Sequence, residues 1–246
     1  MTESLTRIFI LFTSAMVAGG FVMLFPNILK PHLKMLLAFS GAFLLGIAVL
    51  HILPEAYHLG GPEVGLFIIG GFLLQILLEY LSGGIEHGHV HTKQQTEQHH
   101  HHKAISWTVM LSLVLHAITE SMPLGFHGHE HAGHSHEGYL WAIVIHKIPI
   151  TIALVSLMMA ISVPRIKILF YLFIFAIAAP IGILINPLFA HGADQTPVFA
   201  GIMGLAAGIV LHVSTTILLE ASENHRFNFY KMVVIIIGFG LAFISS

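Results

Sequence analysis

The sequence contains no cysteine, and only 9% of its 246 residues are Asp, Glu, Lys or Arg. Without thiols the chain can form no disulfide bond and can offer no thiolate to a metal, so any metal ligand must be a nitrogen or oxygen atom. A soluble globular domain carries about a quarter of its residues as charged side chains. The net charge of −2 says nothing about partners, and no nucleic-acid partner is expected.

In place of charge the chain has hydrophobic residues, which make up 56% of the sequence, with a mean hydropathy of +0.85. Apolar runs long enough to span a bilayer recur along the whole length, and they lack the polar–apolar alternation of transmembrane strands. The pattern predicts an all-α polytopic membrane protein whose partner is the lipid bilayer.

A spanning helix needs about 20 mostly apolar residues, and the sequence contains eight such segments in a single domain, 1–246. The predicted helices are roughly 6–25, 33–57, 62–82, 104–125, 139–162, 166–190, 196–220 and 227–245.

Basic residues predict the orientation of these segments. Eight of the ten Lys and Arg residues fall in the loops between segments 1–2, 3–4, 5–6 and 7–8 or beside those loops, and the exceptions are Arg7 and Lys147. The positive-inside rule makes those four loops cytoplasmic and places both termini outside. We expect a multi-pass protein of the plasma or inner membrane.

Histidine is abundant, with 20 copies, and it gathers in two tracts. Seven histidines lie in the predicted cytoplasmic loop 83–103 and five in the predicted external loop 126–138. Such tracts favour weak, exchangeable metal binding and cannot form a packed core. A merely solvated, tag-like run remains the alternative for His99–His102.

Three histidines inside the predicted spans fall at one depth. His51, His116 and His146 all lie about 9–14 Å below the outer surface at 1.5 Å per helical residue. Glu120 follows His116 by four residues and shares its helix face. Three imidazoles and a carboxylate suit a tetrahedral Zn²⁺, and intramembrane ionisable groups usually mark an ion pathway. Interhelical hydrogen bonding would explain one such histidine, but three at one level favour a cation site.

Other polar residues extend this predicted site. Lys147 is too deep to reach the interface easily, and we expect it to pair with Glu120 and occupy the place of a second cation. A lysine facing a water-filled cavity is the alternative. The predicted entrance comprises Glu55, His58, His127, His129, His131, His134 and His136. The predicted exit comprises Glu79, His212 and Glu220, although Glu79 and Glu220 also suit an ordinary membrane interface.

The motifs resemble those of the ZIP (Zrt/Irt-like) family of zinc transporters. The resemblance rests on "VLHILPEA", "HAITESMPLG", "HKIPIT", "AAPIGILI" and "AAGIVLHVSTTILLE", of which the second and third are the most specific. It implies a ZIP-like bundle of eight helices, external termini, a histidine-rich cytoplasmic loop, and uptake of metal into the cytoplasm by an elevator-like shift. It implies no enzyme activity.

The chain departs from the family at a second metal site that many members carry. The positions concerned hold Ala117, Lys147, Ile150 and Ala179. The resemblance therefore carries over to a single site of His51, His116, Glu120 and His146, and the departures bear on metal choice and transport rate.

Two other functions compete with divalent-metal uptake. An intramembrane zinc hydrolase would need a metal-bound water and a general base, but the sequence has no H-E-x-x-H. A haem-binding electron carrier would leave Glu120, Lys147 and both tracts unexplained. Zn²⁺ is the expected substrate, with Fe²⁺, Mn²⁺ and Cd²⁺ left open, as is a homodimer.

Overall fold

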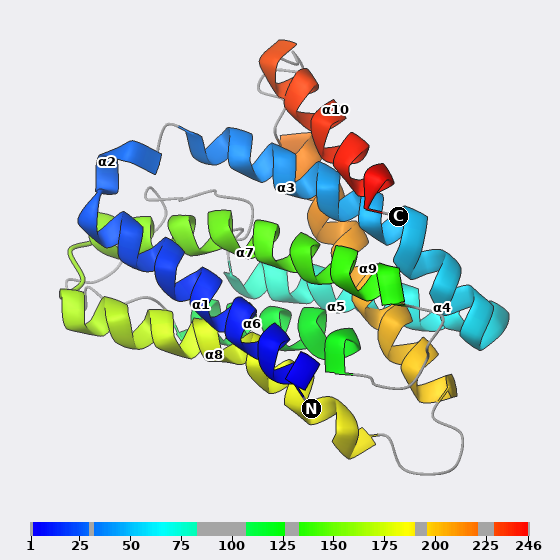
Figure 1. Ribbon diagram of the computed structural model, residues 1–246. Coiled ribbons are helices and arrows are strands. Elements are labelled where there is room, and N and C mark those ends of the chain that lie inside the picture. The colour runs from blue at the N-terminus through cyan, green and yellow to red at the C-terminus, as the bar shows by residue number, and fades with distance from the viewer. Residues whose placement is uncertain are drawn as a thin grey trace.

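The structure is a computed structural model that describes residues 2–29, 32–82, 107–125, 133–189, 196–220 and 229–245. Within these ranges every regular element is a helix and there is no strand. Figure 1 shows the long helices lying alongside one another, with α10 at one edge of the bundle against α3.

The elements follow one another along the chain with short breaks. They are α1 (Thr2–Leu24), α2 (Pro26–Leu29), α3 (Leu33–Ile47), η2 (Ala48–Ile52), α4 (Leu53–Gly60), η3 (Gly61–Glu63), α5 (Val64–Ser82), α6 (Trp107–Ser121), η5 (Met122–Gly125), α7 (Gly133–Ala160), α8 (Arg165–Phe189), α9 (Thr196–Glu220) and α10 (Phe229–Ile244).

Six described helical stretches are long and apolar enough to cross a membrane, which confirms a polytopic α-helical membrane protein. One of them, Leu33–Ser82, has 50 residues, and the apolar α10 is shorter, with 16. Each of the eight expected segments contains helix, but eight separate crossings and external termini stay predictions. α7 begins at Gly133, inside the range 126–138 predicted as an external loop, and that loop stays a prediction.

A π-helical turn interrupts the run from α3 to α4. It covers Ala48–Ile52 and ends two residues before Pro54. Proline has no backbone N–H and its ring crowds the preceding turn, so the regular hydrogen-bond ladder cannot continue through this point. The wider turn therefore absorbs the interruption, and it carries His51. The following turn at Gly61 has a φ of 61°, a conformation in which glycine is favoured.

Packing divides the helices into two groups. The site group contains α1, α6, η5, α7 and α8, and the flanking group contains α3, η2, α4, α5, α9 and α10. Most of the closest helix pairs lie within a group, including α5 with α9, α10 with α3, α6 with α8, and α1 with α7 and α8. The groups meet mainly where α3 packs on α7 and where α5 and α9 pack on α6.

Glycines bring α5 and α9 into close contact inside the flanking group. A Cβ added to Gly71 would collide with the backbone carbonyl of Leu205, and one added to Gly208 would collide with that of Ile68. Small residues at helix interfaces permit this approach in membranes, where packing replaces the hydrophobic effect as the main attraction. α5 and α9 therefore form a closely packed pair.

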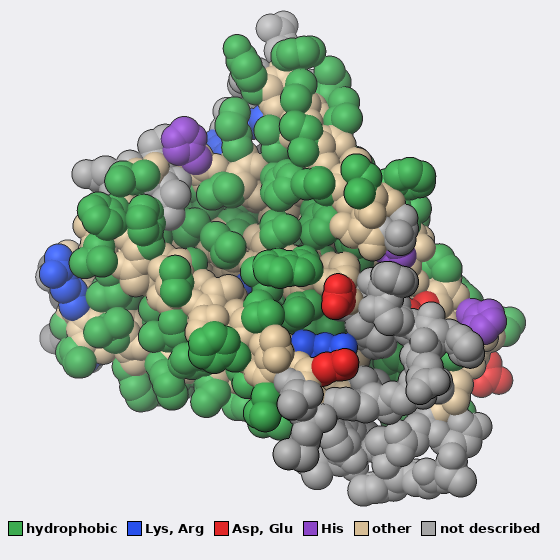
Figure 2. Space-filling view, in the orientation of Figure 1, with side chains coloured by type: hydrophobic (Ala, Val, Ile, Leu, Met, Phe, Trp, Pro, Cys, Tyr) green, Lys and Arg blue, Asp and Glu red, His purple; other side chains and the backbone are tan. Residues whose placement is uncertain are grey.

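The site group has a hydrophobic core of its own. Its buried residues come from α1, α6, α7, α8 and the turn between the last two, and they include Leu113, Ile150 and Phe175. Large apolar side chains also cover the outside of the molecule, and Figure 2 shows them spread over the visible face. This arrangement suits a surface that contacts lipid.

Candidate metal centre

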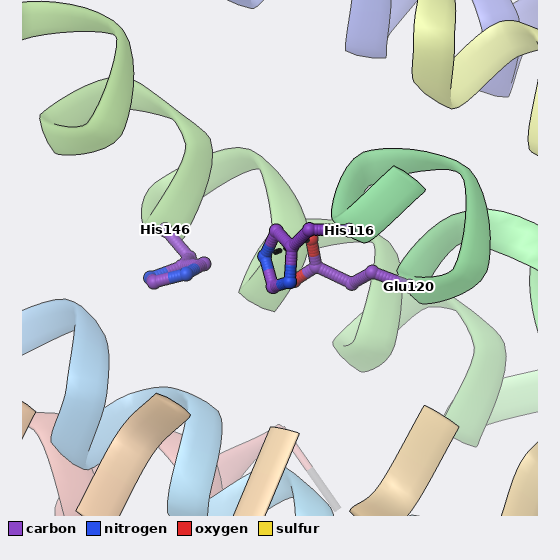
Figure 3. Close-up of side chains that lie close together, drawn as sticks. All are labelled: His116, Glu120 and His146. Carbon is purple, nitrogen blue, oxygen red and sulfur yellow. Dashed lines mark ion pairs between the residues drawn. The ribbon is translucent and has the colours of Figure 1, made fainter. Parts of the chain in front are cut away.

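The centre consists of His116 and Glu120 on α6 and His146 on α7. One ligand atom from each residue lies within 4.8 Å of the other two. The His116 Nε2 atom is 3.5 Å from Glu120 Oε2, and the two imidazole rings meet edge to face with centroids 6.0 Å apart. Figure 3 shows the three side chains converging between their helices. All three are almost fully buried, with 0–4% of their surface exposed.

The spacing on α6 and the position of α7 explain this convergence. Residues four apart on a helix face the same side, so His116 and Glu120 form one ligand pair. Tyr139 lies seven residues before His146, about two turns along the same face of α7. Its hydroxyl donates a hydrogen bond to the backbone carbonyl of Glu120. Tyr139 thus links the two helices beside the ligands.

A further contact fixes α6 against α8. The Ser121 hydroxyl donates to the backbone carbonyl of Ala179 over 2.9 Å. Gly182 permits this contact, because a Cβ at that position would collide with Ser121 Oγ and the carbonyl of Ile118. The serine directly after Glu120 thus packs tightly against α8, although its hydroxyl also lies within hydrogen-bond distance of the carbonyls of Ala117 and Ile118 on α6.

His116 is oriented by Gln75 on α5. The His116 Nδ1–H donates to Gln75 Oε1 over 3.0 Å, and both side chains are buried. A proton on Nδ1 leaves the lone pair of the imidazole on Nε2, the nitrogen that faces Glu120. His116 is therefore held in the tautomer that can bind a metal through Nε2.

The ligand set suits a divalent cation. Two imidazoles and one carboxylate are common zinc ligands, and three protein ligands leave a fourth position open. Glu120 Oε1 has no hydrogen-bond partner among the described residues, although it is buried. A buried carboxylate oxygen without a donor is costly, and a bound cation would remove that cost. Ligand atoms around tetrahedral zinc lie about 3.3 Å apart, so the three side chains would close in slightly on binding.

His51 does not belong to this group in the structure. It lies in the π-helical turn, is half-buried, and its Nε2 is 3.5 Å from the backbone carbonyl of Ala242 on α10. The four-ligand set expected from the sequence is thus reduced to three residues that lie together. A role of His51 as a ligand stays a prediction.

Lys147 is buried and interacts electrostatically with Glu120, although its Nζ has no hydrogen-bond partner among the described residues. Its Nζ lies over the Phe175 ring, 4.8 Å from the centroid, and no ion pair with Glu120 occurs among the described residues. Consecutive residues on a helix point about 100° apart, so Lys147 and His146 do not share one face of α7. The pairing with Glu120 and the idea that Lys147 replaces a second cation both stay predictions.

The other positions of the expected second site are apolar and packed. Ala117 and Ile150 belong to the core of the site group, and Ala179 is buried in a neighbouring cluster. None of these three side chains offers a metal ligand. The surroundings of the three-residue centre thus contain no second ligand set at these positions.

The predicted entrance is only partly covered by the structure. Glu55 is half-buried on α4 and His58 is exposed on the same helix. Of the external histidines, residues 127, 129 and 131 lie outside the described residues, and at 134 and 136 only the backbone, within α7, is described. The cytoplasmic tract 83–103 also lies outside them.

Two of the three predicted exit residues lie together. His212 Nε2 on α9 is 3.4 Å from Glu79 Oε2 on α5, and the His212 ring packs edge to face on Phe72, with centroids 4.8 Å apart. Glu220 is the last residue of α9, and its side chain is not described. Glu79 is one helical turn from Gln75, so this pair lies next to the metal centre along α5.

Sequence reasoning missed Gln75 and Tyr139. A signal for Gln75 was present, since it is the only residue with a polar side chain in the apolar run 64–78. A polar residue within such a run usually has a partner on another helix. No comparable signal marked Tyr139, because tyrosine is common near membrane interfaces.

Comparison with known proteins gives one clear match. A family model described as ZIP Zinc transporter matches residues 82–246, which is more than half of the chain and includes all three residues of the centre. A search of curated proteins finds no match.

Proposed function

Because the chain belongs to the ZIP zinc transporter family, we propose that it carries Zn²⁺ into the cytoplasm through a single intramembrane site of His116, Glu120 and His146. Family members are multi-pass membrane transporters of divalent metals and not enzymes, which sets the hydrolase and haem alternatives aside. Zinc as the substrate, the single site and the direction are the proposed parts.

The convergence of the three side chains is the observation that supports the proposal. Two histidines and a glutamate from separate turns of α6 and α7 lie within 4.8 Å of one another in the interior of an apolar bundle. Such an arrangement is expensive in lipid unless the groups bind an ion. The nitrogen and oxygen ligands favour zinc among divalent cations, and Fe²⁺, Mn²⁺ and Cd²⁺ are the competing substrates to test.

We propose that the site moves with its helix group. All three ligands belong to the site group, whereas Gln75, Glu79 and His212 belong to the flanking group. A hydrophobic core within the site group supports movement as one body. The apolar contact between the two groups is formed by a second cluster, which includes Leu44, Ile143 and Ala207. The resulting mechanism is elevator-like, with α6 sliding along α5 and α9.

The proposed orientation has eight crossings and both termini outside. The turn between α4 and α5, in which Gly61 has a positive φ, supports two crossings in the 50-residue stretch Leu33–Ser82. In this orientation, Glu55 and His58 lie toward the outside and Glu79 and His212 toward the cytoplasm. An ion would therefore pass the exposed residues of α4, the three-residue centre and then the His212–Glu79 pair.

Reconstituted vesicles test the transport proposal. Purified protein in vesicles that enclose a zinc-sensitive dye should accumulate external Zn²⁺ with a saturable rate. Folded protein that shows no saturable accumulation of any of the four cations would contradict the function. The control is His116→Ala, in which the loss of one of three ligands should reduce uptake to that of empty vesicles.

A further inference from the structure

Two hydrogen bonds join α6 to α5 about one turn apart. The Ser112 hydroxyl donates to the backbone carbonyl of Leu78, and the His116 Nδ1–H donates to Gln75 Oε1. Ser112 and Gln75 are completely buried and His116 is 2% exposed. Both bonds cross from the site group to the flanking group, but only one of them ends on a predicted metal ligand.

We infer that Gln75 is a positioning residue that gives the metal centre its full affinity only while α6 lies against α5. The inference rests on the proposed function for its transport part, whereas its metal-binding part stands on the contact itself. Gln75 touches the ligand His116 and is not a ligand in this arrangement, so it acts through the imidazole.

The first part of the argument concerns affinity. A histidine that ligates a metal usually donates its other N–H to an oxygen, which fixes the ring and makes the ligating nitrogen a better donor of electrons. Gln75 Oε1 is such an oxygen, 3.0 Å from Nδ1. A cation on Nε2 polarises the N–H further, so the bond to Gln75 and the bond to the metal strengthen each other. Loss of such a partner typically costs about 10–100-fold in metal affinity.

The second part concerns release. Gln75 lies on α5 in the flanking group, so a displacement of α6 along α5 must break its bond to His116. The ligands would travel with the site group, but the residue that orients His116 would stay behind. Affinity therefore falls as the site moves, and release of the ion toward the His212–Glu79 pair becomes easier. The fixed position of Gln75 thus makes affinity depend on the position of the site group.

Substitutions at Gln75 and Ser112 separate this role from simple packing. Gln75→Leu keeps most of the volume and removes the acceptor, and Gln75→Glu keeps an acceptor and gives it charge. Ser112→Ala is the matched control, because it removes the other hydrogen bond between the same helices without touching a ligand. The tract histidines are replaced by serine in all proteins, so that binding reports the core.

Binding and transport are measured on the same full-length proteins. Zn²⁺ affinity is obtained in detergent by competition with a chromophoric chelator, and KM and maximal rate are obtained in vesicles. For Gln75→Leu we expect affinity to fall about 10–100-fold, and for Ser112→Ala we expect almost no change in affinity. For Gln75→Glu we expect affinity at or above that of the unsubstituted protein and a maximal rate several-fold lower, since a charged acceptor holds α6 more strongly.

Two results would overturn the inference. Equal losses of affinity in Gln75→Leu and Ser112→Ala would mean that both residues only support packing. A loss of zinc affinity in Gln75→Glu as large as in Gln75→Leu would mean that the acceptor has no role. If the leucine variant does not fold, a loss of affinity of about 10-fold or more in Gln75→Glu would overturn the inference by itself. Absence of transport in the unsubstituted protein would instead contradict the proposed function, while the binding measurements would still test Gln75.

Discussion

The molecule contains two contacts between histidine and glutamate that look alike in distance but differ in setting. His116 Nε2 is 3.5 Å from Glu120 Oε2, and His212 Nε2 is 3.4 Å from Glu79 Oε2. The first pair is 2% and 5% exposed and has His146 as a third member, whereas the second is 11% and 26% exposed and joins no described group of three ligands. A buried pair with a third ligand suits cation binding, whereas the more exposed pair has only two ligands, and its role as an exit stays a prediction.

The helices that carry the two pairs differ as well. The first pair lies within one helix of the site group, so its members move together whatever that group does. The second pair joins α5 to α9, two closely packed helices of the flanking group. The three-residue cluster thus lies on the site group, which is proposed to move. The His212–Glu79 pair lies on the flanking group, which is proposed to stay in place. Five substitutions would break or sharpen this comparison.

The largest effect is expected from the ligands themselves. Glu120→Gln removes the only negative charge of the cluster while its volume stays nearly the same, so zinc affinity and saturable uptake should both fall to background. The measurements are zinc binding and vesicle uptake after correction for the amount of folded protein. Near-normal uptake by a folded Glu120→Gln protein would remove the cluster from the transport pathway.

The next effect concerns the rigidity of the α5–α9 pair. Gly71→Ala forces a methyl group onto the carbonyl of Leu205 and should cost about 1–3 kcal/mol of stability, as overpacking usually does. Gly70→Ala is the control, since a Cβ there meets nothing within 4 Å. Thermal unfolding in detergent should show a lower Tm for the first variant alone. Equal Tm values would mean that α5 and α9 adjust to each other easily.

The more exposed pair should influence rate more than affinity. His212→Asn removes the imidazole from the pair beside Phe72 and should lower the maximal uptake rate several-fold, because the ion loses a place to pause on leaving the core. Affinity in the core should stay the same. An affinity loss as large as that of Glu120→Gln would show that the two pairs form one site.

Lys147 tests whether the core holds one ion or two. Lys147→Glu replaces a buried ammonium with a carboxylate next to His146 and should raise the number of core zinc ions from one to two in a protein without tract histidines. Lys147→Met, which keeps the stem over Phe175 and has no charge, should leave the count at one. An unchanged count in the glutamate variant would show that Lys147 serves packing alone.

The smallest effect is expected from the external histidines. Replacing the five histidines of 126–138 with serine should raise the apparent KM a few-fold at low zinc and leave the maximal rate almost unchanged. Such tracts raise the local ion concentration without taking part in translocation. A collapse of the maximal rate at unchanged KM would place them in the translocation mechanism.

Much of the fold, but only part of the metal centre, could be predicted from the sequence. Apolar runs of about 20 residues predict helices in lipid because no other local structure satisfies the backbone there. The spacing of His116 and Glu120 likewise predicts a shared face, since four residues make about one turn. Four of the five family motifs lie within the stretch 82–246 that the family match covers, and "VLHILPEA" with His51 lies before it.

The predicted depth of a residue in its span was a poorer predictor of the site than the spacing of residues along one helix. Counting residues along a span predicts the height of a side chain but not the direction in which it points. His51 lies in the π-helical turn, and its Nε2 is near the backbone carbonyl of Ala242 rather than in the three-residue group. Lys147 likewise has its Nζ over the Phe175 ring, a contact that counting residues along the span does not predict. The directions of side chains around a helix depend on packing between helices, which residue spacing does not contain.

The most direct test of the account is anomalous scattering from crystals of the full chain soaked in Zn²⁺ and measured on both sides of the zinc edge. The account predicts one core zinc peak within coordination distance, about 2.0–2.2 Å, of His116 Nε2, Glu120 and His146. An empty cluster in crystals that show zinc elsewhere in the bundle, or two zinc peaks in the core of the unsubstituted protein, would contradict it.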